Sequence, residues 1–295
     1  MKLAKIVLAI IAILLPFQAG AAVKVVAATS DLAYYARTIG GDKVEVSSIA
    51  SPTADLHYVE VRPSYMVKLR DADLALKVGL ELDMWMTRLI DGSRNDKVKV
   101  VDCSEYVHPM EVPTFKPDAS YGDLHRFGNP HYWLTPDNLE PITQAIAEGL
   151  AEVDPADAET FNKNRDAFLA SVREQLPSIK EMAAPLNGKE IVTYHNSWPY
   201  FAAYFGIDLP IFVEKFPGVA PSPSHISDVI DLVKGHGIKV VAMEPYFDRR
   251  VPNKIASVSG AKVVTLYPSI GGRDKNESYI DWLRGNVQAL IEAEK

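Results

Sequence analysis

The chain has 295 residues, of which 47% are hydrophobic and 23% charged, enough for two modest lobes that each bury a core. Acidic residues outnumber basic ones by 38 to 31, the formal net charge is −7, and no Lys/Arg cluster stands out. This balance argues against a nucleic-acid partner, because binding phosphates requires a basic surface.

The N-terminal segment has the pattern of a secretory signal peptide. Lys2 and Lys5 precede an almost wholly apolar stretch at residues 6–17, and small residues at 19–21 suit a signal peptidase. The stretch falls short of the roughly 20 residues that a membrane-spanning helix needs, although a single transmembrane anchor is the alternative. We therefore expect residues 1–21 to be cleaved and the mature chain to be free in the periplasm. The single cysteine, Cys103, lies far from this segment, and we expect it to be buried at a strand end.

Residues 22–150 alternate short β-rich runs with helical patterns, which implies parallel strands joined by crossover helices. Pro, Gly and Asp are frequent at residues 109–130, which predicts an irregular excursion. The expected strands are residues 23–29, 44–49, 74–78 and 98–101, and the expected helices are residues 32–39, 63–69 and 82–89.

From Asp154 the pattern becomes that of one long helix. Pro155 suits a helix start, and apolar residues recur at helical spacing to about Met182. About 28 residues would span about 40 Å, longer than most globular helices. Within residues 151–186 we expect a strut that lies across two lobes; an ordinary amphipathic core helix is the alternative.

Residues 187–295 repeat the alternation. The sequence therefore predicts an α/β protein of two lobes, each a mostly parallel four-stranded sheet with flanking helices, joined by the long helix. Ligands of such sheets bind beyond the carboxyl ends of the strands, in the cleft where the loops converge. The expected strands here are residues 190–194, 211–214, 239–243 and 262–266, and the expected helices are 198–205, 225–234, 252–259 and 279–292.

Three histidines fall on loops or strand ends where this cleft would lie. His57 follows the second expected strand, His131 ends the irregular excursion, and His195 ends the first strand of the second half. Neutral imidazole is a common ligand of zinc and similar metals. For any one of them alone, a structural loop histidine is the better interpretation. Ligands drawn from both halves would couple metal binding to closure of the lobes, but the spacing of the histidines alone has little specificity.

The segments around these histidines resemble the substrate-binding proteins of the zinc/manganese ABC importer family, in order along the whole mature chain. His57 is followed by Arg62-Pro63-Ser64. The motif around the second histidine is Pro130-His131-Tyr132-Trp133-Leu134. Further matching segments are Thr193-Tyr194-His195 with Tyr200-Phe201, Pro221-Ser222-Pro223, Met243-Glu244-Pro245 and Ser259-Gly260-Ala261-Lys262.

The resemblance implies two four-stranded α/β lobes joined by a rigid helix, with a divalent metal ion bound in the cleft. It also implies that the protein, which we expect to be a monomer, hands this ion to the membrane permease of an ABC importer. The metal ligands would be His57, His131 and His195. No catalytic or cofactor-binding residue is expected, so the protein would not be an enzyme.

The chain departs from this family at the fourth ligand. Many members supply an aspartate from the loop after the last strand, where this chain has Ser269, and the His-rich insertion of many zinc members is missing. The fourth position stays open to water, to His125 or to a carboxylate that the sequence does not place. Glu60 and Glu244 are the expected hydrogen-bond partners of the ligand imidazoles.

Three imidazoles without an assigned carboxylate favour zinc over manganese, which prefers oxygen ligands. A manganese-specific or other metal-specific member of the family is the alternative, and copper and nickel would also bind three imidazoles. A zinc-dependent hydrolase is a less favoured alternative, because the chain has no His-Glu-x-x-His helix. A binding protein for an organic solute is a third.

Overall fold

The computed structural model describes residues 21–115, 122 and 125–295. The expected signal peptide, residues 1–21, lies outside the described residues except for Ala21. Within the described ranges, no helix combines the length and the apolar character that crossing a bilayer would require.

The N-terminal lobe is built on a four-stranded parallel sheet in the order β2-β1-β3-β4. Side chains of β1 and β3 are almost entirely buried, as expected for central parallel strands covered on both faces. Cys103, the residue directly after β4, is buried and has a free thiol, as expected. The strands are β1 (Val23–Ala27), β2 (Val44–Ser48), β3 (Leu74–Lys77) and β4 (Lys99–Asp102); the helices are α1 (Ser30–Gly40), α2 (Pro63–Arg70), α3 (Met84–Ser93) and α4 (Leu139–Val153).

Helix α4 is not among the helices expected from the sequence. Its buried residues Leu139, Ile142, Ile146 and Leu150 follow the spacing of one helix face, so the periodic signal is present. It packs against α1 and α5 and thereby covers the sheet. The irregular excursion before it has no regular secondary structure in its described part.

The C-terminal lobe has a parallel sheet in the order β5-β6-β7. The segment expected as its fourth strand, residues 211–214, lies beside β5 but forms only a single parallel bridge, from Phe212 to Thr193. Pro210, which has no N–H to donate, interrupts the pairing between this bridge and a second isolated bridge, from Glu190 to Asp208. The elements are β5 (Val192–Thr193), β6 (Val240–Met243), β7 (Lys262–Thr265), α6 (Pro199–Phe205), α7 (Pro223–His236), α8 (Arg250–Ser259) and α9 (Tyr279–Glu294).

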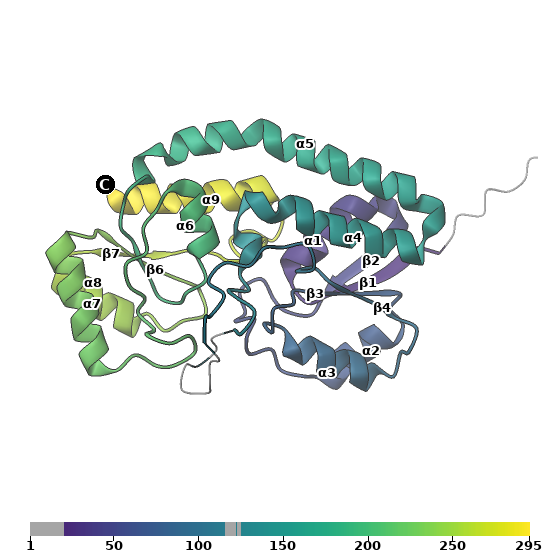
Figure 1. Cartoon of the computed structure of the whole chain (residues 1–295), viewed down its shortest axis with the longest axis horizontal. Coiled ribbons are helices and arrows are strands. Elements are labelled where there is room, and N and C mark those ends of the chain that lie inside the picture. Colours follow the sequence, from purple (N-terminus) through teal and green to yellow (C-terminus); the bar gives the residue numbers. More distant parts are fainter. Residues whose placement is uncertain (1–20, 116–121, 123–124) are drawn as a thin grey trace, which may run out of the picture.

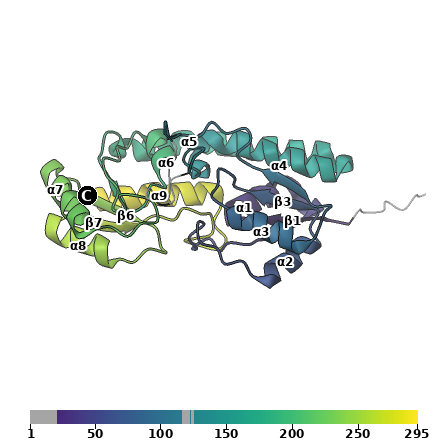
Figure 2. The ribbon, with the colours of Figure 1, turned by 60° about the horizontal axis from the view of Figure 1, so that its bottom comes forward.

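Helix α5 (Ala158–Ala183) lies across both lobes, as the sequence predicts (Figure 1). It packs against α1 and α4 of the N-terminal lobe and against α9 of the C-terminal lobe. Figure 2 shows α9 again alongside α5 from a second direction. One continuous apolar core runs beneath α5 through both lobes, from Val25 of β1 to Leu290 of α9. The two lobes are therefore joined by packing as well as by the chain.

A buried polar contact also joins the lobes at the start of α1. The Ser30 hydroxyl donates to the carbonyl oxygen of Ile270 (2.9 Å), and the Ile270 N–H donates to the Asp31 carboxylate (2.9 Å). Burial raises the pKa of Asp31 from 3.8 to about 7, and the nearby Glu277 carboxylate adds to this rise. The hydrogen bonds from Ile270 and Ser269 oppose the rise, but burial outweighs them.

Replacing Asp31 with Asn should make unfolding less dependent on pH. The pKa of Asp31 is higher in the folded state, so its contribution to stability is complete below about pH 4 and is lost as the pH rises through about 7. Asn stays neutral and can still accept from Ile270. We expect Asp31→Asn to gain about 2–3 kcal/mol relative to the wild type between about pH 5 and pH 8.

Calorimetric unfolding of the metal-free proteins across this pH range measures the difference. The exposed Asp42 beside the same helix provides the matched control, and Asp42→Asn should track the wild type. A stability difference between Asp31→Asn and the wild type that stays constant with pH would contradict the assignment.

Candidate metal site

His57 lies in the loop that follows β2, at the carboxyl end of the N-terminal sheet. The carbonyl oxygen of Leu56 accepts the indole N–H of Trp85 (2.8 Å), which fixes the loop against α3. Oδ1 of Asp55 accepts both the backbone N–H and the ring Nδ1 of His57, each at 3.0 Å. Burial raises the pKa of Asp55, but its hydrogen bonds with His57 outweigh burial and the net shift is downward. The acceptor is therefore an ionised carboxylate, which can only accept a hydrogen bond. Nδ1 of His57 must then carry the ring proton, and the lone pair of the ring is on Nε2.

His131 repeats this local arrangement with an amide in place of the carboxylate. Oδ1 of Asn129 accepts the backbone N–H of His131 at 3.0 Å and its ring Nδ1 at 2.9 Å. The next two residues anchor the segment: Tyr132 donates to the carbonyl of Val78 in the same lobe, and Trp133 donates to the carbonyl of Pro268 in the other lobe. The free lone pair of His131 is again on Nε2.

His195 comes two residues after β5, at the carboxyl end of the C-terminal sheet. Its Nδ1 lies 2.9 Å from Oε2 of Glu214, and both side chains are buried. The backbone places Glu214 there, because its N–H donates to the carbonyl oxygen of Tyr194 (2.9 Å) in the pairing beside β5. Sequence analysis did not single out this glutamate as a functional residue, although it is the last residue of the expected strand at residues 211–214.

The three predicted histidines form one cluster, the only group of this kind among the described residues. One ligand atom from each lies within 4.8 Å of the others. Their ring centroids are 5.1–5.4 Å apart. Tetrahedral zinc with Zn–N bonds of about 2.0–2.1 Å would hold its nitrogen ligands roughly 3.4 Å apart, so small side-chain adjustments suffice to close around an ion.

Burial favours the neutral form of two of these imidazoles. It lowers the pKa of His131 well below the ordinary value, and the neighbouring imidazoles lower it further. Burial also lowers the pKa of His195, although the hydrogen bond with Glu214 opposes the shift. Neutral imidazole is the form that binds metal, so burial favours the metal-binding form of His131 and His195.

The expected hydrogen-bond partners Glu60 and Glu244 do not contact these imidazoles. Glu60 pairs with Arg62 at the surface. Glu244 is fully buried and accepts from the Ser197 hydroxyl (2.7 Å) and the Trp198 indole (2.9 Å). Burial raises the pKa of Glu244 to about 8. The partners are instead Asp55, Asn129 and Glu214. The first two lie two residues before a histidine, a local pattern that was visible in the sequence.

Residues 25–293 match the family described as zinc-uptake complex component A, periplasmic. The chain belongs to this family.

Relatives within the family carry names that specify different metals. The manganese-binding lipoprotein MntA of Halalkalibacterium halodurans is 26% identical over 277 residues, covering 92% of this chain and 88% of the relative. The iron-binding protein YfeA of Yersinia pestis is 27% identical over 245 residues, covering 81% and 75%. The high-affinity zinc uptake system protein ZnuA of Bacillus subtilis is 23% identical over 263 residues, covering 87% and 82%.

Solved structures of the family superpose on more than nine-tenths of the chain. A crystal structure of ZnuA has a TM-score of 0.79 at 25% identity and covers 93% of this chain and 100% of that chain. A zinc-bound ZnuA deletion mutant has a TM-score of 0.76 at 27% identity and covers 92% and 96%. The family consists of substrate-binding transport proteins, and this member is a metal-binding component of ABC metal uptake.

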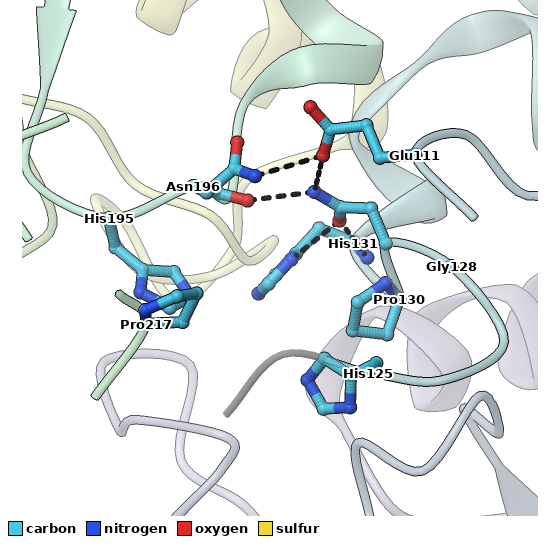
Figure 3. Close-up of a pocket in the computed structure, with 9 residues that line it drawn as sticks. Glu111, His125, Gly128, Pro130, His131, His195, Asn196 and Pro217 are labelled. Atoms are coloured by element: carbon cyan, nitrogen blue, oxygen red, sulfur yellow. Dashed lines mark hydrogen bonds between the residues drawn. The ribbon is translucent and has the colours of Figure 1, made fainter. Parts of the chain in front are cut away.

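A hydrogen-bonded network joins His131 to the C-terminal lobe (Figure 3). The Asn129 amide, whose oxygen holds His131, donates to Glu111 Oε2 (2.9 Å) and to the carbonyl of Asn196 (2.9 Å). The Asn196 side chain donates to the same oxygen of Glu111 (2.9 Å). Tyr200 donates to the carbonyl of Asn129 (2.7 Å). Glu111 thus fixes the Asn129 amide so that its oxygen faces His131.

Removing Glu111 should weaken metal binding without removing a ligand. In Glu111→Ala the Asn129 amide loses the acceptor that orients it, so His131 is held less firmly. We expect zinc affinity to fall about tenfold, the lower end of the effect of losing an outer partner of a metal ligand. Calorimetric titration of zinc measures the change.

The matched control is Glu60→Ala, which removes an exposed carboxylate from the loop of His57 and should bind zinc as the wild type does. Equal affinities in Glu111→Ala and Glu60→Ala would show that the network has no part in holding His131.

Proposed function

We propose that this protein captures zinc in the periplasm and delivers it to the membrane permease of an ABC importer, with His57, His131 and His195 as its ligands. The observation that carries the proposal is the convergence of three imidazoles from both lobes. In each ring an acceptor holds Nδ1, so Nε2 is available to the ion. The ion is cargo, so a site between two lobes suits binding and release better than a cage within one lobe.

The donor set favours zinc over manganese. The three clustered ligands are nitrogens, which suit zinc, whereas manganese prefers carboxylate and other oxygen ligands. The carboxylates of Asp55 and Glu214 lie one hydrogen bond behind the ligands, where they balance the ion's charge without occupying a coordination position. Relatives named for zinc, manganese and iron belong to the same family, so similarity to these relatives does not select one metal. The choice of zinc is supported by the ligand chemistry.

The same contacts favour transport over catalysis. A zinc hydrolase needs a carboxylate or similar base that is free to accept a proton from metal-bound water. The carboxylates of Asp55 and Glu214, the ones bonded to the cluster, already accept from ligand imidazoles. They orient the ligands and are not placed as free bases.

The periplasmic location and the permease partner rest on two further points. The N-terminal pattern predicts a cleaved signal peptide. The matched family is described as a periplasmic component of a zinc-uptake complex. We propose that the protein acts as a monomer.

Each of the three ligand histidines should be essential for tight binding. We expect one zinc per chain in protein purified without chelator. Replacing His57, His131 or His195 with Ala should lower zinc affinity by more than the roughly 10- to 100-fold that loss of an outer partner costs. Elemental analysis gives the stoichiometry, and calorimetric titration gives the affinities. His236→Ala is the control, because His236 is exposed and pairs with Glu190. Wild-type affinity in any of the three variants would remove that residue from the ligand set.

Zinc should also outcompete manganese by a wide margin. Protein loaded with manganese should exchange its metal completely when one equivalent of zinc is added, because the clustered donors are imidazole nitrogens. Manganese release, followed by electron paramagnetic resonance, measures the exchange. Retention of most of the manganese would favour the manganese-specific alternative.

A further inference from the structure

His125 lies directly beside the three-histidine cluster. Its ring centroid is 5.4 Å from that of His57, and the planes are tilted by 30°. This spacing equals the largest centroid separation within the cluster itself. His125 also lines the same pocket as His131 and His195, and Figure 3 shows its ring at the edge of that pocket. A fourth imidazole is therefore within reach of a small side-chain movement.

Two neighbouring nitrogens are left without partners at this point. Within the described part of the chain, Nε2 of His57 and Nε2 of His125 are buried and make no hydrogen bond. A buried polar atom without a partner is unfavourable, and folded proteins rarely keep one without a function. His57 Nε2 is a proposed metal ligand. The same ion would satisfy His125 Nε2.

Ser269, at the position where many members of the family have an aspartate ligand, interacts with a carboxylate outside the cluster. Ser269 is buried, and its hydroxyl interacts with the Asp31 carboxylate at the contact between the lobes. The next residue, Ile270, is fixed there by two further hydrogen bonds, with Ser30 and with Asp31. The loop after β7 therefore serves the interlobe contact, and the fourth coordination position must be filled from elsewhere.

The segment that carries His125 is anchored to the N-terminal lobe. The backbone N–H of Arg126 donates to Glu81 Oε2 (3.0 Å), and its guanidinium Nε donates to Oε1 of the same carboxylate (2.9 Å). These bonds lower the pKa of Glu81, so the carboxylate stays ionised and the pair is an ion pair. Glu81 lines a second pocket together with His57 and His125. Arg126 thus holds His125 next to His57.

We propose that His125 supplies the fourth ligand of the metal ion, through Nε2. The proposal rests on the three-histidine site proposed above and completes it as four imidazoles in a tetrahedral arrangement. Three of the four would come from the N-terminal lobe and one, His195, from the C-terminal lobe. A site of four imidazoles has no oxygen donor, which sharpens the preference for zinc over manganese.

The direct test is His125→Ala in the full mature chain, with zinc as the probe. We expect zinc affinity to fall about tenfold or more. X-ray absorption at the zinc edge should count one histidine fewer than in the wild type. Added imidazole should restore part of the affinity, because it can occupy the vacated position. Exogenous imidazole should leave wild-type binding unchanged.

Controls separate this proposal from the function and from misfolding. His108 is an exposed histidine directly before the irregular excursion, and His108→Ala should match the wild type in affinity and in histidine count. Thermal unfolding of metal-free His125→Ala reports whether the variant is folded. The number of histidine ligands that X-ray absorption counts in the wild type decides the proposal, whether or not His125→Ala is folded. Four histidines support the proposal, and three overturn it while leaving the proposed function intact. Absence of zinc binding by the wild type would instead overturn the proposed function.

Discussion

An imidazole binds a metal only through a nitrogen that carries no proton, and in this protein hydrogen bonds to the opposite nitrogen meet that requirement. Asp55, Asn129 and Glu214 each accept from the Nδ1 of one clustered histidine. These acceptors fix the tautomer and the ring orientation together, so that the three Nε2 lone pairs are free for the ion. Burial adds to this by disfavouring the protonated rings. The rest of the fold brings the three histidines and their hydrogen-bond acceptors to one place.

The two lobes meet through contacts that also position the site. Trp133, two residues after His131, donates to the carbonyl of Pro268 in the other lobe. Tyr200 and Asn196 of the C-terminal lobe hold the Asn129 backbone and side chain. The apolar core is continuous beneath α5. Separating the lobes must therefore break buried contacts and disturb the support of His131 at the same time. With the ligands proposed above, binding of the ion and contact between the lobes would be coupled for this reason.

Much of the fold followed from the sequence, because parallel strands and amphipathic helices have local signals. The long helix was predicted to begin at Pro155, and α5 runs over Ala158–Ala183 after a short 3₁₀ turn. The expected fourth strand of the second sheet was reduced to one bridge at Phe212, because pairing length depends on the neighbouring strand as well as on local composition. The helix α4 was missed although its apolar spacing was present.

The sequence by itself determined the kind of site: loop histidines at the carboxyl ends of parallel strands, and the residue types Asp55 and Asn129 placed two positions before two of them. Tertiary structure alone decided which acceptor serves His195, because Glu214 lies 19 residues away and is brought there by pairing beside β5. It also turned Ser269 toward Asp31 and placed His125 beside His57. Such contacts join residues far apart in the chain, and their distances depend on how the lobes pack, which no local pattern encodes.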